Sequence, residues 1–372
     1  MLIGCPKEIK PQEFRAGLTP RAAAEAIAHG HRVAIETGAG VGAGFPDEDY
    51  TDVGAEIVGT AAEIFARADL VVKVKEPQAV ERAMLREGQM LFAYLHLAPD
   101  RDQTRELLES GVTAIAYETV TDAAGHLPLL APMSEVAGKL APQTGAWTLQ
   151  KANGGRGVLL GGVPGVAPAE VVVIGGGVAG TQAARIAAGM GADVTVLDTS
   201  LPRLRQLDDF FRHEFRTDYA SPAWTAESVA RADMVIGAVL VPGATTPRVV
   251  TRDMLATMKP GSALVDVAID QGGCFETSRA TTHENPVYEE EGIMHYCVAN
   301  MPGAVPRSST LALANATLPF LLALADKGWR QACSDDPHLL NGLSIHAGHL
   351  TCAPVGIAQE IDVLSPALAL KI

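Results

Sequence analysis

One stretch, Ala169–Asp198, limits what this chain can fold into more than any other. It opens with the β-branched run Val171–Ile174, which predicts a strand that is buried on both faces. Three glycines follow in the spacing G-x-G-x-x-G, namely Gly175, Gly177 and Gly180. Small residues after them suit a helix packed against a sheet, and a second strand, Asp193–Leu197, ends at Asp198. Strand, turn, helix, strand and acid therefore stand in the order of a dinucleotide-binding unit.

Each part of this unit has a physical role in holding a dinucleotide. The first glycine permits a tight turn, the second lets the backbone approach a pyrophosphate, and the third lets helix and strand pack closely. The helix N-terminus offers unpaired N–H groups and the positive end of its dipole. A glycine-rich turn in an ordinary α/β domain is the alternative interpretation of the same pattern.

Asp198 also bears on the choice of dinucleotide. A carboxylate at this position accepts hydrogen bonds from the ribose hydroxyls and repels a 2′-phosphate. Thr199 and Ser200 follow it in place of an arginine, so we expect NAD rather than NADP. Arg203 lies close enough in the sequence to leave NADP use open.

Length and composition indicate two α/β domains. A chain of 372 residues exceeds what one core usually supports. Apolar residues make up 48% of it and aromatic residues only 5%, a mix in which small side chains let helices lie close to parallel strands. The formal net charge of −14 argues against nucleic acid or an anionic membrane surface as a partner. Anionic substrates would need locally placed Arg or Lys.

The cysteines and the N-terminus indicate the compartment. The five cysteines are widely scattered, at Cys5, Cys274, Cys297, Cys333 and Cys352. No C-x-x-C pair occurs, so the sequence supports neither a zinc site nor a disulfide framework, and we expect no bound metal. The N-terminus lacks the pattern of a signal peptide, and from the sequence we expect no stretch long enough to span a membrane. These observations predict a soluble cytoplasmic protein with reduced, buried thiols.

The first third of the chain alternates between strand and helix patterns, which implies a mostly parallel sheet. Thr19 and Pro20 form an N-cap and first turn for a helix that runs to about Ala28. The expected strands are Leu2–Cys5, His31–Glu36, Ala55–Val58, Leu70–Val74, Met90–Leu95 and Val112–Tyr117. A second glycine-rich loop, 38–44, lacks a following helix of small residues and an acid-tipped strand, so we expect a flexible turn there rather than a phosphate cradle.

Two long helices are expected on either side of the nucleotide unit, over Pro132–Lys151 and Ser308–Lys327. The second can return the chain to the first domain, where the C-terminal tail would add to it. The nucleotide unit itself is expected to close with a strand at Met294–Val298. We therefore expect a discontinuous substrate-binding domain, 1–130 with 305–372, and a dinucleotide-binding domain, 131–304.

Four polar residues stand at predicted strand ends, where ligands bind in open parallel sheets. Arg15 follows the first strand, and its guanidinium can bind a carboxylate through two parallel hydrogen bonds. Lys75 and His96 end the strands LVVKVK and MLFAYLH, and Asp270 follows ALVDVAI. Simpler interpretations remain open: a solvated arginine, a lysine paired with Glu76, a buried boundary histidine and an aspartate that caps a turn.

The sequence resembles the alanine dehydrogenases, relatives of the soluble subunit of the proton-pumping nicotinamide nucleotide transhydrogenases, nearly from end to end. The resemblance rests on PKEIK with Arg15, VKVKEP around Lys75, YLHLA around His96, MSEVAG around Ser134, GGVPGV, DVAIDQGG with Asp270, TTHENPVY, and VANMPGAVPRSST around Asn300. His96 together with Asp270 in IDQGG favours the dehydrogenase over the transhydrogenase subunit.

This resemblance implies reversible, NAD-dependent oxidative deamination of L-alanine to pyruvate and ammonia. It implies α/β architecture with two Rossmann-like doubly wound domains, mostly parallel sheets, joining long helices and a cleft between the domains, in a homo-oligomer that is commonly a hexamer. Arg15 and Lys75 would bind the substrate, His96 would be the general acid/base, and Asp270 would be its partner. Cofactor contacts would come from Ser134, Gly175, Gly177, Val178, Ala179, Gly180, Asp198, Arg203, Val239, Leu240, Val267, Ala268, Ile269, Arg279, Val298, Asn300 and Met301.

The chain departs from the family pattern in three places. Ala16 and Gly17 replace the usual V-A after Arg15, which we expect to loosen the loop that carries Arg15. Ala220 precedes Ser221 where a serine is common beside the adenine ribose, and the tail from Cys333 matches poorly. Two other functions are compatible with the fingerprint: a transhydrogenase-like subunit that passes hydride to a partner protein, and a non-catalytic NAD-binding sensor. The preferred amino acid depends on side-chain packing around a methyl group.

Overall fold

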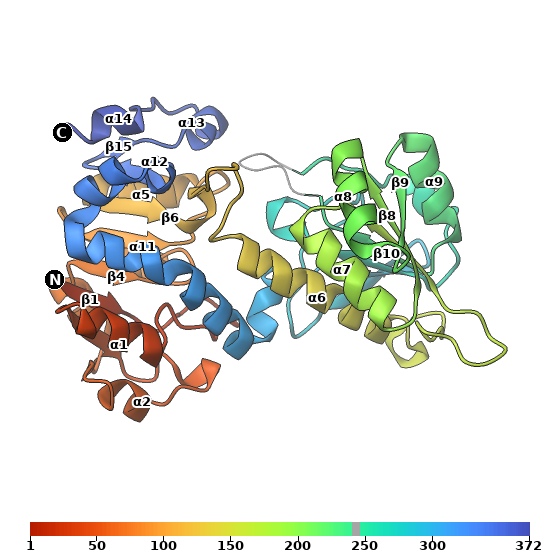
Figure 1. Ribbon diagram of the computed structural model, residues 1–372, viewed down its shortest axis with the longest axis horizontal. Coiled ribbons are helices and arrows are strands. Elements are labelled where there is room, and N and C mark those ends of the chain that lie inside the picture. Colours follow the sequence, from red (N-terminus) through yellow and green to blue (C-terminus); the bar gives the residue numbers. More distant parts are fainter. Residues whose placement is uncertain (240–245) are drawn as a thin grey trace. The chain divides into compact units, whose positions relative to one another are not determined.

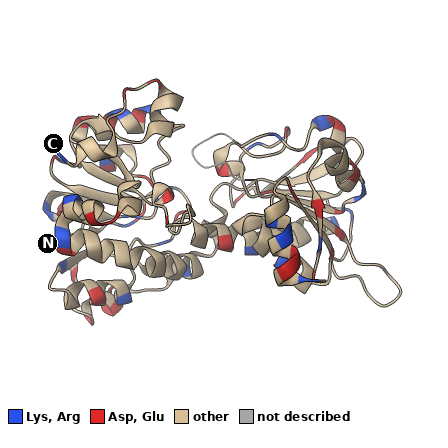
Figure 2. Ribbon diagram, turned by 45° about the horizontal axis from the view of Figure 1, so that its top comes forward, with Lys and Arg blue, Asp and Glu red and all other residues tan. Residues whose placement is uncertain are grey.

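The computed structural model describes residues 1–239 and 246–372 (Figure 1). The chain divides into two compact units. Unit 1 combines Met1–Met133 with Val305–Ile372, and unit 2 is the continuous segment Ser134–Ala304. Charged residues of both signs are interspersed over the helices of both units (Figure 2).

Unit 1 is built on a sheet that runs in the order β3-β2-β1-β4-β5-β6-β14-β15. Its strands are β1 (Leu2–Cys5), β2 (Arg32–Glu36), β3 (Glu56–Val58), β4 (Leu70–Val72), β5 (Met90–Ala93), β6 (Thr113–Ala116), β14 (Leu343–His346) and β15 (His349–Leu350). The first six are parallel, while β14 and β15 are antiparallel to their neighbours. The order 3-2-1-4-5-6 is that of a doubly wound fold, and its switch point lies between β1 and β4. The expected parallel sheet is confirmed.

Short helices connect the parallel strands of unit 1. They are α1 (Pro20–Ala28), α2 (Asp47–Thr51), α3 (Ala61–Arg67), α4 (Ala79–Arg82) and α5 (Arg101–Ser110), with the 3-10 turns η1 (Val41–Ala43) and η2 (Tyr117–Thr119). The Thr19 side chain accepts a hydrogen bond from the N–H of Ala22 and so caps α1 as predicted.

The strands β4 and β5 end two residues earlier than predicted, at Val72 and Ala93. The apolar pattern of the sequence continues past the regular ladder of hydrogen bonds and made both strands look longer. Backbone pairing nevertheless goes on beyond the assigned ends. The N–H of Lys73 donates to Phe92 O at 3.1 Å, and the N–H of Tyr94 donates to Val74 O at 3.1 Å. The segments that follow β4 and β5 therefore leave the sheet side by side.

The C-terminal segment returns to unit 1 and extends its sheet through β14, which pairs with β6. Its helices are α11 (Pro306–Asp335), α12 (Pro337–Leu340), α13 (Ala353–Gln359) and α14 (Pro366–Ala369). Contrary to the sequence expectation, α11 is long and apolar enough by length and composition to cross a membrane. It is interrupted at Gly328, where φ is 72°, and it packs against α1 and η1 within unit 1. Those contacts are typical of a core helix.

Unit 2 contains a second sheet, in the order β9-β8-β7-β10-β11-β13-β12. Its strands are β7 (Glu170–Ile174), β8 (Asp193–Asp198), β9 (Arg216–Tyr219), β10 (Met234–Gly237), β11 (Ala263–Asp266), β12 (Val287–Glu290) and β13 (Ile293–Tyr296). The 3-2-1-4-5-6 order recurs among its six parallel strands, β7 to β11 and β13, now with the switch point between β7 and β10. The edge strand β12 is antiparallel to β13 and was not predicted.

Helices cover both faces of the unit 2 sheet. They are α6 (Ala131–Thr148), which begins in unit 1, α7 (Val178–Gly189), α8 (Leu201–Phe211), α9 (Pro222–Arg231) and α10 (Arg252–Leu255), with η3 (Lys151–Asn153), η4 (Ile269–Gln271) and η5 (Met301–Ala304). Val171 and Val173 of β7 join a core with alanines of α6 and α7, whereas Val172 and Ile174 pack with residues of α9 and α10. The prediction of a strand buried on both faces is confirmed, with all four residues at most 2% exposed.

Two glycine-containing loops are more tightly packed than the sequence suggested. The loop 38–44 is a turn, but it is packed: a Cβ on Gly40 would lie 2.6 Å from Phe45 O and from the Tyr50 hydroxyl. A Cβ on Gly17 would lie 2.6 Å from Val72 O, at the end of β4. Glycine is thus needed at position 17 for a close backbone approach, which holds the loop beside β4 instead of loosening it.

Candidate functional site

The glycine turn after β7 has the local geometry of a phosphate-binding loop. Gly175 has φ 99°, and a Cβ there would lie 2.7 Å from Ala238 O. A Cβ on Gly180 would lie 1.7 Å from Gly175 O, so only glycine allows α7 this close to the turn. Gly177 caps α7 without any side-chain hydrogen bond, and a Cβ on it would meet no atom within 4 Å. The helix N-terminus is therefore available to an anion, as a pyrophosphate requires.

Asp198, at the tip of β8, is joined to this turn. Its Oδ2 accepts a hydrogen bond from the N–H of Gly176 at 2.7 Å, and its Oδ1 accepts one from Ser200 N–H at 2.8 Å. Arg203 donates through Nε to Gly176 O at 2.6 Å and through Nη2 to Thr181 Oγ1 at 2.8 Å. A carboxylate beside the glycine turn suits ribose hydroxyls and opposes a 2′-phosphate.

Ser134 lies near the same helix N-terminus. It stands one turn before Gly138 on α6, and residues four apart share a helix face. A Cβ on Gly138 would lie 2.2 Å from Ala179 O, which shows that α6 crosses the first turn of α7 at close range.

Further predicted cofactor residues follow other strands of unit 2 at the same, carboxyl edge of the sheet. Val239 follows β10, Val267, Ala268 and Ile269 follow β11, and Val298 follows β13. The N–H of Thr281 donates to Cys297 O at 2.9 Å, which brings the segment that carries Arg279 beside Val298. The Arg279 guanidinium lies 3.8 Å from the centre of the Tyr288 ring. Leu240 falls outside the described residues.

Asp270 and Asn300 are in direct contact. The exposed carboxylate of Asp270, in η4, accepts the N–H of Asn300 at 3.0 and 3.4 Å. Asn300 has a positive φ of 61°, and His283 Nε2 lies 3.3 Å from its carbonyl oxygen. Met301 follows as the first residue of η5. Asp270 thus caps a turn, as the simpler interpretation proposed, while its carboxylate stays accessible.

A fully buried acid, Asp266, holds the loop that carries Asp270. It accepts hydrogen bonds from Ala268 N–H at 3.0 Å, Cys274 N–H at 2.9 Å and Ser278 Oγ at 2.5 Å. Burial raises the pKa of Asp266, although these donors favour the carboxylate. Asp266 was not among the residues predicted from the sequence, and its signal there is an acid inside the buried run ALVDVAI.

In unit 1, Arg15 is buried and held by Glu13. Its Nε and Nη2 donate to the two carboxylate oxygens at 2.7 and 2.6 Å, and Nη1 lies 3.0 Å from Met133 Sδ. Burial alone would lower the pKa of Arg15, but the hydrogen bonds and charge of Glu13 raise it. Arg15 is therefore no solvated surface residue. A thioether is a weak acceptor, so the Met133 contact contributes little to holding this side chain.

A buried charge cluster supports the segment that carries Lys75. Glu8 accepts the N–H groups of Val74 at 2.7 Å and Lys75 at 3.4 Å, and it pairs with Lys73 Nζ at 3.1 Å. Lys73 also pairs with Glu81 at 2.7 Å. Burial by itself would lower the pKa of Lys73, but the two glutamates raise it.

The expected alternative for Lys75, a pair with Glu76, is only partly met. Glu76 forms an ion pair with Lys10. Burial by itself would raise the pKa of Glu76, but the charges of Lys75, Lys10 and His96 lower it. The charge of Lys75 thus acts on Glu76 without an ion pair between the two side chains.

His96 follows β5 with a positive φ of 48°, which is uncommon for a residue with a side chain. Its ring is nearly parallel to that of Tyr94, at a centroid distance of 5.8 Å and an interplanar angle of 9°. Its N–H donates to Glu118 Oε1 at 2.7 Å. The backbone conformation and the stacking together restrict the direction of the imidazole.

Comparison with known proteins assigns the chain to a family. Residues 4–137 match "Alanine dehydrogenase/PNT, N-terminal domain", and residues 141–353 match "Alanine dehydrogenase/PNT, C-terminal domain". The chain belongs to the alanine dehydrogenase/PNT family. Its curated relatives include proteins named alanine dehydrogenase from Halomonas elongata, 56% identical over 99% of both chains, and from Mycobacterium tuberculosis H37Rv, 55% identical over the full length of both.

Solved structures agree with this family assignment. The fold is similar to that of an L-alanine dehydrogenase, with a TM-score of 0.92 and 49% identity over 96% of this chain and 99% of the other. It is also similar to a transhydrogenase from Sinorhizobium meliloti, with a TM-score of 0.81 and 27% identity over 95% of this chain and 99% of the other. The α/β class with two mostly parallel sheets is thus confirmed.

Within each unit, the candidate residues gather at one edge of a sheet. Arg15, Lys75 and His96 follow the neighbouring strands β1, β4 and β5 at their carboxyl ends. Lys75 and His96 each stand three residues beyond strands that lie about 4.8 Å apart. Arg15 stands ten residues beyond β1, and its loop returns to the end of β4, where a Cβ on Gly17 would lie 2.6 Å from Val72 O. Three acids hold these residues and were not predicted from the sequence: Glu8, Glu13 and Glu118. Glu8 and Glu13 share one short segment with Arg15, and that proximity was their only signal.

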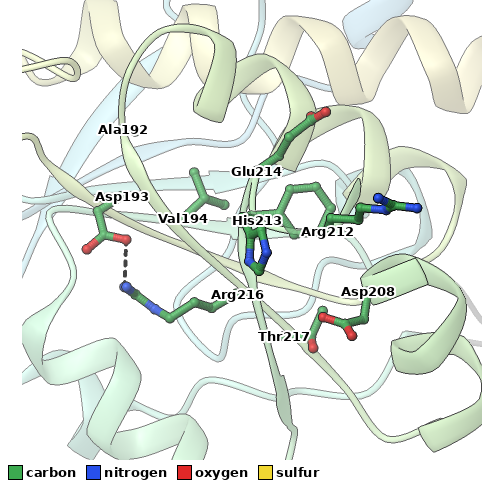
Figure 3. A pocket seen from close by; sticks show the side chains of 10 residues that line it. Ala192, Asp193, Val194, Asp208, Arg212, His213, Glu214, Arg216 and Thr217 are labelled. Atoms are coloured by element: carbon green, nitrogen blue, oxygen red, sulfur yellow. Dashed lines mark ion pairs between the residues drawn. The ribbon is translucent and has the colours of Figure 1, made fainter. Parts of the chain in front are cut away.

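A pocket of about 550 Å³ lies at the opposite edge of the unit 2 sheet (Figure 3). Its lining includes Asp193 and Arg216, which form an ion pair of 2.6 Å at the starts of β8 and β9. The predicted cofactor residues follow the other ends of these strands, so the pocket is separate from the glycine turn. Among the described residues, no group of three or more His, Cys, Asp or Glu is arranged to hold a metal ion.

Proposed function

We propose that this chain is an L-alanine dehydrogenase, which oxidises L-alanine to pyruvate and ammonia with NAD and also runs the reverse reaction. One observation carries the proposal. In a chain 52–56% identical to proteins named alanine dehydrogenase, a guanidinium, an ammonium and an imidazole follow neighbouring parallel strands, from Arg15, Lys75 and His96. This is the set that a small amino acid with one carboxylate requires.

In the proposed mechanism, the substrate carboxylate docks on Arg15, whose guanidinium is oriented by Glu13. Lys75 binds the carboxylate and the carbonyl oxygen of pyruvate, and its positive charge stabilises the negative charge of the bound substrate. When bound, NAD would supply the hydride acceptor for oxidation at the α-carbon of alanine, which turns the amine into an iminium. Water then adds to the iminium carbon, and ammonia leaves as the carbonyl of pyruvate forms. His96 takes a proton from the water and returns one to the departing nitrogen. We assign Asp270 to the same proton transfer, as the family resemblance implies.

The unit 2 residues fit a dinucleotide. The open space at Gly177, the uncapped start of α7 and the Asp198 carboxylate beside the glycine turn suit a pyrophosphate and a ribose. We assign NAD contacts to Ser134, Gly175, Gly177, Val178, Ala179, Gly180, Asp198, Arg203, Val239, Leu240, Val267, Ala268, Ile269, Arg279, Val298, Asn300 and Met301. In this assignment, 131–304 is the dinucleotide-binding domain, and 1–130 with 305–372 is the substrate-binding domain.

We also infer a homohexamer located in the cytoplasm, on the strength of the family resemblance. Sedimentation of the purified protein should then give a mass six times that of the 38.9-kDa chain. A monomer or dimer at working concentration would contradict the hexamer.

A transhydrogenase-like hydride carrier is the second candidate, favoured by the similarity to the Sinorhizobium meliloti structure. One assay separates the two. The purified chain is mixed with NAD and a panel of amino acids, and NADH absorbance is followed. Alanine-dependent NADH formation by this chain alone supports the dehydrogenase. Absence of signal with alanine, glycine and serine would reject it and leave the hydride carrier or a non-catalytic NAD sensor.

A further inference from the structure

Glu118 occupies the position where the backbone ladder between β5 and β6 stops. The last paired residues of these strands are Ala93 and Ala116. Beyond them the chain of β6 turns into η2, so its backbone no longer offers carbonyl groups to the segment after β5. The half-buried Glu118 side chain takes over this role. Its oxygens accept the Leu95 N–H at 3.1 and 3.2 Å, and Oε1 accepts the His96 N–H at 2.7 Å.

The conformation of His96 needs such support. A non-glycine residue with φ 48° costs of order 1 kcal/mol or more and persists only where its surroundings hold it. Two neighbouring N–H groups converge on one oxygen of Glu118, Oε1, and this geometry supplies that support, because both hydrogen bonds form only while the peptide keeps this orientation. On the other side of the same peptide, Leu95 O accepts a hydrogen bond of 2.6 Å from Gln103 Nε2. The peptide between Leu95 and His96 is thus clamped from two directions.

We propose that Glu118 is a positioning residue for His96: it keeps the residue in its left-handed conformation and thereby aims the imidazole at the substrate. This inference rests on the proposed function, in which His96 moves protons during alanine oxidation. Glu118 acts through the backbone of its neighbour and takes no part in proton transfer. What matters is therefore the reach of its acceptor oxygen rather than its charge.

Three substitutions distinguish reach from charge. Glu118→Gln keeps an acceptor oxygen at the same distance along the side chain but has no charge. Glu118→Asp keeps the charge but is one methylene shorter, and Glu118→Ala removes the acceptor. We expect kcat for alanine oxidation to stay within about threefold of the unmodified chain for Gln, and to fall about tenfold or more for Asp and Ala. KM for NAD should stay within about twofold in all three, because the dinucleotide residues belong to unit 2.

A matched control is available at the opposite edge of the same sheet. Asp69 Oδ2 accepts the Leu2 N–H at 2.7 Å, where β1 and β4 begin. Asp69→Ala removes the same type of contact, a carboxylate on a backbone N–H, away from His96. We expect it to lower the midpoint of thermal unfolding while leaving kcat within about twofold.

The outcomes separate this inference from the proposed function. If the unmodified chain oxidises alanine and His96→Ala abolishes the activity, but Glu118→Ala changes kcat no more than Asp69→Ala does, the positioning role is overturned. It is equally overturned if Glu118→Asp is more active than Glu118→Gln. A His96→Ala variant with a near-normal rate removes the premise and overturns it too. Should Glu118→Ala fail to fold, the comparison of Asp with Gln decides alone.

A double variant adds a readout that a purely structural role would not produce. If Glu118 acts through His96, adding Glu118→Ala to His96→Ala should leave the residual rate unchanged while the thermal midpoint still falls. A further loss of rate of about tenfold in that background would contradict the proposal, because additive effects indicate independent sites.

Discussion

The carboxylate of Glu13 holds the guanidinium of Arg15 through two hydrogen bonds, Nε–Oε1 of 2.7 Å and Nη2–Oε2 of 2.6 Å. Both side chains are at most 2% exposed. A bidentate pair of this kind fixes the plane of the guanidinium, which leaves one orientation for any further acceptor. The residue expected to bind the substrate carboxylate is thus oriented before a substrate arrives.

Glu13→Ala should raise KM for alanine and pyruvate about tenfold or more and destabilise the protein by about 3 kcal/mol, because it leaves a buried cation without its partner. Steady-state kinetics and chemical denaturation test both effects. Glu56→Ala is the control, since its pair with Arg67 is exposed and should contribute little. Equal effects of the two substitutions would contradict a special role for the buried pair.

His96→Ala should lower kcat by about 100-fold or more while NAD still binds, because proton transfer loses its carrier. His96→Gly should be equally inactive but more stable than His96→Ala by about 1 kcal/mol. Glycine adopts the φ of 48° without strain, whereas alanine does not. Denaturation midpoints measure the difference, and an alanine variant as stable as the glycine variant would argue against strain at this position.

Gly177→Ala and Gly180→Ala should separate binding from folding. A Cβ at position 177 meets no atom within 4 Å, so the protein should lose about 1 kcal/mol at most, while its Kd for NAD rises because the methyl group lies where a pyrophosphate would approach. A Cβ at position 180 would lie 1.7 Å from Gly175 O and should destabilise unit 2 itself. Calorimetric titration with NAD and thermal unfolding give the two readouts, and unchanged NAD affinity of Gly177→Ala would contradict the assigned site.

Asp198→Asn should shift the preference from NAD towards NADP. The amide oxygen can still accept the Gly176 N–H, so the turn is kept, but the charge that opposes a 2′-phosphate is lost beside Arg203. The ratio of kcat/KM for NAD to that for NADP is expected to fall about tenfold or more. A ratio that does not move would show that Asp198 has no part in cofactor choice.

Acid should destabilise the protein through His295. This ring is fully buried, with Nε2 2.8 Å from Thr277 Oγ1 and Nδ1 2.9 Å from Ile293 O, and burial lowers its pKa. Below the unfolded-state pKa, about 6.5, the unfolded chain binds a proton that the folded chain does not. Stability from this group is therefore complete above that pH and is lost as the pH falls towards the folded-state pKa, by at most about 1.4 kcal/mol per pH unit.

Denaturation at pH 7.5, 6.5 and 5.5 checks this slope, and His295→Gln should flatten it. The pKa of His346 is also lowered by burial, so some dependence of the same sign remains in that variant. A slope unchanged by His295→Gln would exclude this histidine as the cause.

Local patterns predicted the parts of the fold that depend on local chemistry. The Thr19 cap of α1 and the burial of both faces of β7 follow from neighbours in the sequence. The antiparallel edge strand β12 was missed because a short polar strand becomes regular only through its partner β13.

The carboxylates that support the candidate site were harder to predict for a related reason. Glu8 and Glu118 each accept backbone N–H groups of a separate segment, and no pattern within their own segment predicts that pairing. The prediction that Gly17 loosens its loop was wrong for the same reason. The glycine is required by the close approach of the Val72 carbonyl, 55 positions further along the chain. The roles of Arg15, Lys75, His96 and Asp270 stay predictions that kinetics must test.

The pairing of β14 with β6 has a consequence for how the protein is made. Unit 2 is one continuous segment and can fold on the ribosome while the rest of the chain is still being translated. The sheet of unit 1 lacks its last two strands until residues 343–350 have left the exit tunnel. Until then the edge of β6 is unpaired and exposed to association with other nascent chains. Truncation near the C-terminus should therefore harm the solubility of newly made chains before it harms the nucleotide unit.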